Sequence, residues 1–293
     1  MELSFQIYHY WRSQCAMKGV KMRFLRTFST DMRRMLLSGK FYTALLAVAA
    51  IAFLGIWPEV QASDYQASVY YLVNGRGGIS AFFLAISVLI VLPYALSSRE
   101  DALHNYVHGM ESRAGLKNYT WSKILTASAG AFLVVFLGYI LCFGLLSLKL
   151  PMIKADQLEF LLQKASEGTI NFYDTLIVSG HPALYAAAQF FTEAMGYAFM
   201  AGFALMLSAK IENVFVLLSV PILLYYVSAF ICSITLAPSI FNWYYVMSSG
   251  GWLKWYSPDI ARLLLYVFLY FGSLIFLEGI VYYFWMKRRR IHG

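Results

Sequence analysis

Charged side chains are scarce in this chain. Only 13% of its 293 residues are Asp, Glu, Lys or Arg, against roughly 25% in a typical soluble domain. Hydrophobic residues make up 60% of the sequence, and the mean hydropathy is +0.61. This composition indicates an integral membrane protein. Its length suits about six spans with modest loops, so we expect a single membrane domain over residues 1–293.

Cysteine is also rare. Cys15, Cys142 and Cys232 are far apart, and two of them lie in apolar runs, so the sequence favours neither a disulfide framework nor a zinc site. We interpret them as small core residues.

Several sequence motifs of enzymes are missing. The chain has no G-x-x-x-x-G-K-[ST] loop, so it cannot bind and hydrolyse ATP through a P-loop of its own. It has no G-x-S-x-G elbow and no H-E-x-x-H pair either. We therefore expect no catalytic residue and no cofactor in this chain.

Long apolar segments dominate what is present. Backbone polar groups find no water in hydrocarbon, so each segment is predicted to be a helix. The expected fold class is an all-α membrane protein with six transmembrane helices, in a bundle over residues 41–286. The segments are Phe41–Trp57, Ile79–Leu96, Ile124–Leu148, Ala183–Ser208, Val214–Leu236 and Leu263–Met286.

Bends and close helix contacts are also predicted. Pro93 and Pro221 lie inside the second and fifth segments, where a proline allows a bend. Gly196 and Gly202 mark a small face of the fourth segment.

The basic residues predict the orientation. With the N-terminus inside, 17 of the 23 Lys and Arg residues fall on the cytoplasmic side. Both termini, including the basic tail 287–293, are then cytoplasmic in a multi-pass protein of the cell membrane. Because these residues lie beside apolar runs, anionic membrane lipids explain them better than nucleic acid does.

The N-terminal segment 1–40 contains an amphipathic pattern from Lys21 to Lys40. Phe24, Phe28, Met32 and Leu36 share one helical face, which predicts a helix lying in the headgroup region. The alternative is a basic stretch that only flanks the first span.

Two outer loops carry structure of their own. The sequence DQLEFLLQKASEG, within residues 149–182, predicts a short amphipathic helix on the outer rim. Residues 237–262 hold two prolines and many aromatic residues, which predicts a re-entrant or interfacial hairpin before the last span, or simply an aromatic belt.

Two acids lie inside predicted spans. Glu193 and Glu278 are costly there unless they face a bundle interior or a wet cavity. They are either protonated groups that bridge helices or, with Gln189, part of a translocation path. In the second case the chain could be an ion-coupled secondary transporter or a channel.

The polar interval Ser97–Lys123 separates two apolar runs and has 27 residues. We expect a helix outside the membrane over Glu100–Gly109, a turn near Gly115 and a third span starting close to Lys123. His104 and His108 stand at i and i+4, with Glu100 one turn earlier. These three could bind a metal in a membrane enzyme, but a docking face gives the same spacing, so we assign no metal site.

This layout resembles the permease subunits of type-2 ABC exporters. The likeness rests on the basic helix before the first span, the Arg99-Glu100-Asp101 start of the polar interval, the outer aromatic hairpin and the basic tail MKRRRIHG. The family's local pattern in the polar interval is matched by Glu100, His104, Tyr119, Ser122 and Lys123.

The resemblance implies an export function. In the family this interval forms a coupling helix that docks on a separate ABC ATPase, which supplies ATP and Mg. The implied partners are that ATPase, a second permease chain in a homo- or heterodimer, and membrane lipids. The implied cargo is amphipathic, peptide-like or drug-like. The implied docking residues are Glu100, Asp101, His104, Asn105, His108, Glu111 and Arg113.

Overall fold

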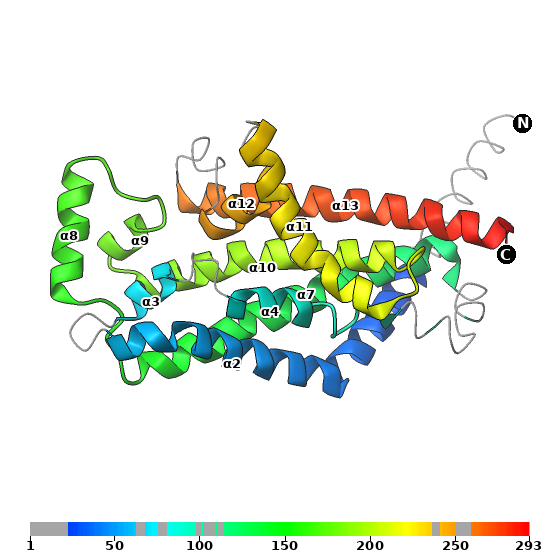
Figure 1. Cartoon of the computed structure of the whole chain (residues 1–293), viewed down its shortest axis with the longest axis horizontal. Helices are drawn as coiled ribbons and strands as arrows, with labels where there is room; N and C mark the ends of the chain where they lie inside the picture. Colours follow the sequence, from blue (N-terminus) through cyan, green and yellow to red (C-terminus); the bar gives the residue numbers. More distant parts are fainter. Residues whose placement is uncertain are drawn as a thin grey trace, which may run out of the picture.

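The described part of the chain is helical. The computed structural model describes residues 23–62, 68–75, 81–97, 101, 109, 114–235, 241–249 and 259–292, and it has no strand among them (Figure 1). Residues 23–36 form the first helix. The others are α2 (Gly39–Ala62), α3 (Val69–Gly75), α4 (Ala81–Leu89), α7 (Leu116–Ser147), α8 (Ala155–Ser166), α9 (Thr175–Val178), α10 (Pro182–Leu207), α11 (Val214–Thr235), α12 (Trp243–Ser249) and α13 (Ile260–His292).

Five helices are long and apolar enough to cross a membrane. They are α2, α7, α10, α11 and α13, and each coincides with a segment predicted from the sequence. The prediction of a multi-pass helical membrane protein is confirmed to this extent.

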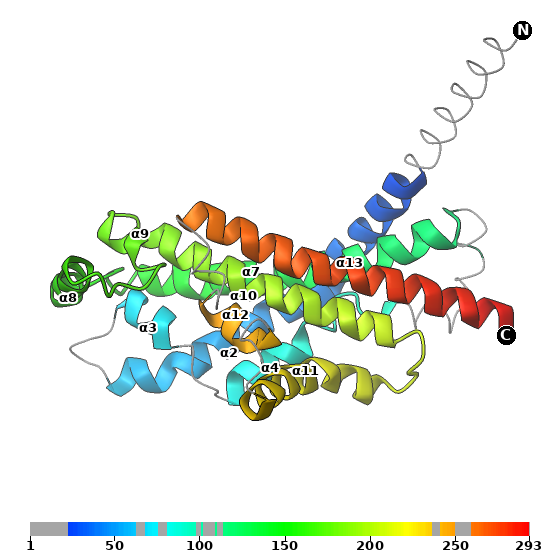
Figure 2. The same ribbon diagram turned by 90° about the horizontal axis from the view of Figure 1, so that it is seen from above.

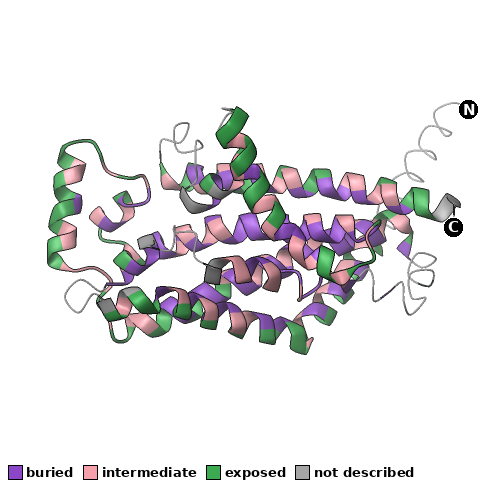
Figure 3. Ribbon diagram, viewed as in Figure 1, coloured by how far each residue is buried: buried purple, intermediate pink, exposed green. Residues whose placement is uncertain are grey.

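Helix α10 lies at the centre of the bundle. In its most apolar stretch 78% of the residues are buried, against 22% in the corresponding stretches of α11 and α13. It packs against α7, α11, α12 and α13, while α2 packs on the other side of α7 (Figure 3). The exposed surfaces of α11 and α13 remain apolar, as expected of surfaces that face lipid or another membrane chain.

The second predicted span is not one continuous helix. Helix α4 ends at Leu89, and residues 90–96 form successive turns with bonds such as Leu92 N–H to the Leu89 carbonyl at 3.1 Å. Pro93 has no N–H and its ring clashes with the preceding helical turn, so the regular bonding pattern stops. The expectation of a helix over all of residues 79–96 was therefore wrong for residues 90–96.

Many of the basic side chains gather at one end of the bundle. Helix 23–36, the start of α7, the turn between α10 and α11 and the end of α13 all lie there (Figure 2). Arg289 of α13 and Glu212 of that turn form an ion pair of 3.5 Å, and the Lys210 amine lies 4.2 Å from the centre of the Trp285 ring. We call this the basic end.

The opposite end holds the predicted amphipathic helix. Helix α8 covers residues 155–166 and lies across the end of the bundle (Figure 1). Its own residue Leu161 is buried. Helix α3 is fixed nearby by bonds from the Val69 and Tyr70 N–H groups to the carbonyls of Pro151 and Met152, each 3.0 Å long.

Helix α12 lies within the predicted hairpin 237–262. It packs against the middle of α10, where Met247 covers Gly196 and the Trp243 and Phe199 rings meet edge to face at 4.9 Å. The small face predicted at Gly196 is therefore a contact site for another element.

Candidate functional site

Four charged side chains meet at the basic end, where the polar interval leaves and re-enters the bundle. Asp31, Arg34, Asp101 and Lys123 form ion pairs, together with the hydroxyl groups of Tyr94, Ser97 and Ser122; we call these seven residues the charge cluster. They come from helix 23–36, residues 94–101 and the first turns of α7.

Lys123 is the centre of the charge cluster and is fully buried. Its ammonium group lies 2.7 Å from Asp101 Oδ2 and 3.6 Å from Asp31 Oδ1. It also donates hydrogen bonds to Tyr94 Oη at 2.8 Å and Ser97 Oγ at 3.4 Å. One cation therefore serves two carboxylates and two hydroxyl groups.

Asp31 is the second buried acid. It accepts a hydrogen bond from Tyr94 Oη at 2.5 Å, and its other oxygen accepts one from the Ser122 hydroxyl. Its side chain is 1% exposed, so these contacts replace nearly all of its hydration.

Arg34 is a partly exposed member of the charge cluster. It donates to Asp101 Oδ1 at 2.9 Å, while 47% of its own side chain is exposed. Partial burial lowers the pKa of the guanidinium, but the hydrogen bond and charge of Asp101 outweigh this, so the pKa lies above its ordinary value.

Breaking the charge cluster apart costs free energy. Separating a buried ion pair, or removing one partner, leaves an unpaired charge at a cost of roughly 3–5 kcal/mol. The two acids and two bases also balance in charge, so the assembled group carries no net charge. Helix 23–36, the end of the second apolar segment and α7 are thereby held in one arrangement.

The sequence pattern did not reveal Asp31. Phe24, Phe28, Met32 and Leu36 were expected to form the apolar face of a helix in the headgroup region, and they are half-buried. The buried residues of this helix are Thr27, Asp31 and Met35, each one residue before a member of the predicted apolar face. The signal for Asp31 in the sequence was that it is the one acid of a strongly basic helix. It lies four residues from Thr27 and four from Met35, on the same face.

Asp101 is the one predicted docking residue that the structure describes. It was expected among the residues that dock on the ATPase, and its side chain is 1% exposed and bound to Arg34 and Lys123. Near the predicted turn, Gly115 interrupts the helical structure, with φ of 82° at the residue before α7. Glu100, His104, Asn105, His108, Glu111 and Arg113 lie outside the described residues.

Lys123 lies within a helix and is buried. The third span was expected to start close to it; helix α7 begins seven residues earlier, at Leu116, and Lys123 is inside the protein. Its partners come from segments distant in sequence, so no local pattern distinguished it from a membrane-flanking lysine.

Glu193 and Gln189 lie on α10 and are half-buried. Glu193 Oε1 accepts a hydrogen bond of 2.7 Å from the hydroxyl of Tyr139 on α7, which is itself fully buried. This carboxyl group therefore links two core helices.

Glu278 belongs to α13 and contacts α7 and α10, at a different depth in the bundle from Glu193. It is 4% exposed, and a Cβ added at Gly202 would collide with its carboxyl group and would lie 2.8 Å from Ser128 Oγ. Among the described residues neither of its carboxyl oxygens has a hydrogen-bond partner. Such surroundings suit a neutral carboxyl group.

The two acids do not share a site. Their neighbours on α7, Tyr139 and Ser128, are 11 residues apart, which is about 16 Å along a helix. The two carboxyl groups therefore make separate helix contacts, at different depths in the bundle.

No group of three or more His, Cys, Asp or Glu residues suited to a metal occurs in the described ranges. The set formed by Glu100, His104 and His108 lies outside them. Of the cysteines, Cys142 is buried in α7 as predicted, and Cys232 is half-buried in α11.

Neither a family model, nor a curated protein, nor a solved structure matches this chain. Its function is therefore inferred from its own residues and their geometry.

Proposed function

We propose that this chain is the membrane subunit of an ATP-driven exporter and that a separate ATPase docks on its polar interval 97–123. One observation carries the proposal. Both ends of that interval, Ser97 and Asp101 at its start and Ser122 and Lys123 at its end, join the same buried charge cluster. A cytoplasmic segment held in this way can receive a push and transmit it.

The route of transmission follows the packing. Force on the polar interval reaches Lys123 through Asp101, and Lys123 belongs to the rigid helix α7. Helix α7 contacts α2, α10 and α13, so its displacement moves the centre of the bundle. The partner ATPase supplies ATP and Mg, and this chain supplies the pathway.

The finer architecture follows from the same proposal. Residues 81–97 make a sixth crossing, in which the short helix α4, packed against α2 and α11, is followed by turns. Because α12 meets α10 near its midpoint, residues 237–262 form a re-entrant hairpin. A second permease chain completes the pathway for an amphipathic, peptide-like or drug-like cargo.

Co-expression and co-purification with P-loop ATPases encoded beside this gene test the proposal. Asp101 is unsuitable for charge reversal because it is buried in ion pairs. We expect Glu100→Lys, or His104→Glu, to reduce the recovered ATPase at least tenfold while the permease keeps its own thermal stability.

Glu212→Lys is the matched control. Glu212 is an acid at the same end of the molecule, and its side chain is 82% exposed. It should leave the complex intact. If wild type recovers no ATPase, or if all three variants behave alike, the proposal is wrong.

A further inference from the structure

Glu278 is a buried acid for which the described part of the chain provides no partner. Its side chain is 4% exposed, neither carboxyl oxygen has a hydrogen-bond partner, and no ion pair of the described residues includes it. The Ser128 hydroxyl of α7, which meets Glu278 at Gly202 of α10, has no hydrogen-bond partner among these residues either. Two unsatisfied polar groups therefore share one contact between α13, α7 and α10.

This contact leaves little room for a ligand. A Cβ added at Gly202 would collide with Glu278 Oε2 and lie 2.8 Å from Ser128 Oγ, so both oxygens lie close to the backbone of α10. The Trp121 ring covers the next residue of α13, Gly279, with its Cζ3 atom 2.6 Å from an added Cβ. A metal ion needs several oxygen ligands around it, whereas a proton needs only the carboxyl group.

Helices α7 and α10, which the structure describes in full, provide no cation that could neutralise Glu278. On α7 the charged residue nearest to Ser128 is Lys123, which is bound to the acids of the charge cluster. On α10 the one charged residue is Glu193, an acid nine residues from Gly202. An ionised carboxylate without a partner is strongly unfavourable in an apolar interior. Glu278 therefore needs a proton to stay in this position.

The other ionisable side chains in this region do not change that balance. Tyr282, one turn further along α13, and Tyr197, five residues before Gly202, carry phenol groups, which are uncharged near neutral pH. Lys210 lies beyond the end of α10, and its amine is 4.2 Å from the centre of the Trp285 ring.

The carboxyl group has no evident packing role. Without hydrogen bonds, its desolvation is uncompensated, so an apolar side chain would stabilise this helix contact better. What the acid adds is the capacity to bind and release a proton, and ionisable residues inside membrane spans commonly mark proton and ion sites. Release requires hydration of the carboxylate, so the contact between α13, α7 and α10 has to open.

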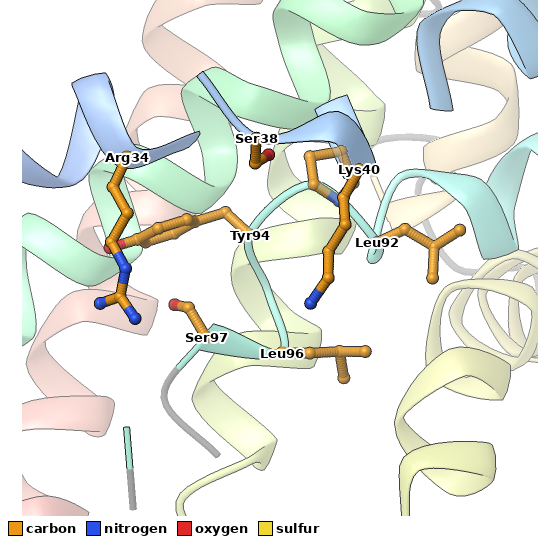
Figure 4. Close-up of a pocket in the computed structure, with 8 residues that line it drawn as sticks. Arg34, Ser38, Lys40, Leu92, Tyr94, Leu96 and Ser97 are labelled. Atoms are coloured by element: carbon orange, nitrogen blue, oxygen red, sulfur yellow. The ribbon is translucent and has the colours of Figure 1, made fainter. Parts of the chain in front are cut away.

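The basic end is the nearer source of water. Glu278 is nine residues from the basic tail, about 14 Å along α13, and 18 residues, about 27 Å, from the other end of this helix. A pocket of about 90 Å³, with room for several water molecules, lies at the basic end. Tyr94 and Ser97 of the charge cluster line part of it, as Figure 4 shows, and both contact Lys123 of α7.

We propose that Glu278 is a proton-binding site, which holds a proton while α13 is packed against α7 and α10 and releases it to the water of the basic end when this contact opens. Opening is then linked to pH: low pH favours the packed arrangement and high pH favours the open one. The site does not depend on docking of an ATPase, so it goes beyond the proposed transport function.

The experiment uses the full chain in a neutral detergent. Infrared spectroscopy at neutral pH measures the carbonyl stretching band of protonated carboxyl groups, and hydrogen exchange of the α13 amide groups measures opening of the helix contact. We expect Glu278→Gln to lose part of that band. The opening constant of wild type, divided by that of Glu278→Gln at the same pH, should rise about tenfold for each pH unit near neutrality, because one proton is released.

Glu212→Gln is the matched control. The Glu212 side chain is 82% exposed and stays hydrated in both arrangements, so this variant should keep the infrared band and the pH dependence of wild type. Should Glu278→Gln fail to fold, Glu278→Met serves as a second variant. It keeps an unbranched side chain of similar length without an ionisable group, and it should give the same two results.

Three results would overturn the proposal. A wild-type spectrum without a protonated carboxyl band, or with a band that the Glu278 variants keep, would show that this group is ionised. Equal pH dependence of opening in wild type and these variants would mean that no proton is released. Stabilisation of wild type, but not of Glu278→Gln, by sodium or potassium ions at constant pH would identify a metal cation as the ligand.

Discussion

Lys123 is the residue on which the charge cluster depends most. Its one ammonium group neutralises two buried carboxylates, whereas Arg34 contacts only Asp101 among them and is half exposed. Loss of the Lys123 charge would leave Asp31 without a cation among its described ion pairs.

We therefore predict that Lys123→Met lowers the free energy of unfolding by about 3–5 kcal/mol, although it keeps the apolar stem. Reversible unfolding in mixed detergent micelles measures this. Lys117→Met is the control, because Lys117 is exposed on the same helix, and its effect should stay within about 0.5 kcal/mol.

A double variant checks the cause. Adding Asp31→Asn to Lys123→Met removes the carboxylate that lost its cation, while Asp101 keeps Arg34, so part of the lost stability should return. If Lys123→Met is as stable as Lys117→Met, the charge cluster does not hold these segments together.

Among the helices, α7 lies close to α2 at Gly138. A Cβ at this position would lie 2.8 Å from Val48 Cγ1 and 3.3 Å from the Leu45 carbonyl oxygen. A β-branched side chain and a backbone atom cannot move aside easily, so the helix separation depends on the missing side chain.

Gly138→Leu should therefore destabilise the protein by about 1–3 kcal/mol through overpacking. Gly144→Leu is the comparison, since Gly144 lies on the same helix with nothing within 4 Å of an added Cβ. Both are measured by thermal unfolding in one detergent. Similar melting temperatures for the two variants would contradict the proposed contact.

The helices could be predicted from the sequence better than their contacts. Length and hydropathy indicated α2, α7, α10, α11 and α13, and amphipathic spacing indicated α8, because these signals are local. Pro93 was recognised as a place for a bend, but whether a helix continues past a proline depends on its neighbours.

The charge cluster could not be predicted in the same way. Asp31 and Lys123 are separated by 91 intervening residues, and each has a sufficient local explanation, as a surface residue of a basic helix and as a membrane-flanking lysine. Only the folded chain shows that the two side chains neutralise each other.

At the scale of the molecule, the loops alternate between the two ends of the bundle. The turn 208–213 and the end of α13 meet at the basic end, while α8 lies at the other (Figure 1). Seventeen of the 23 basic residues belong to segments predicted to share one side, so this side should be cytoplasmic.

Reporter fusions test this orientation. A reporter at the N-terminus or the C-terminus should be active in the cytoplasm, and one inserted after Gly168 should be active outside. Gly168 follows α8, is exposed and has φ of 69°, so an insertion there disturbs little. A cytoplasmic signal from the Gly168 insertion would reverse the orientation.

The order of the charged residues along the chain also has a consequence for biosynthesis. Asp31 leaves the ribosome before Lys123, so this acid must wait, hydrated or protonated, until α7 has been made, whereas Asp101 can already pair with Arg34. The ion pairs of the charge cluster are complete only then, so the early segments reach their final positions only after the first 123 residues have been synthesised. Chains truncated before α7 should accordingly be substrates for membrane quality control.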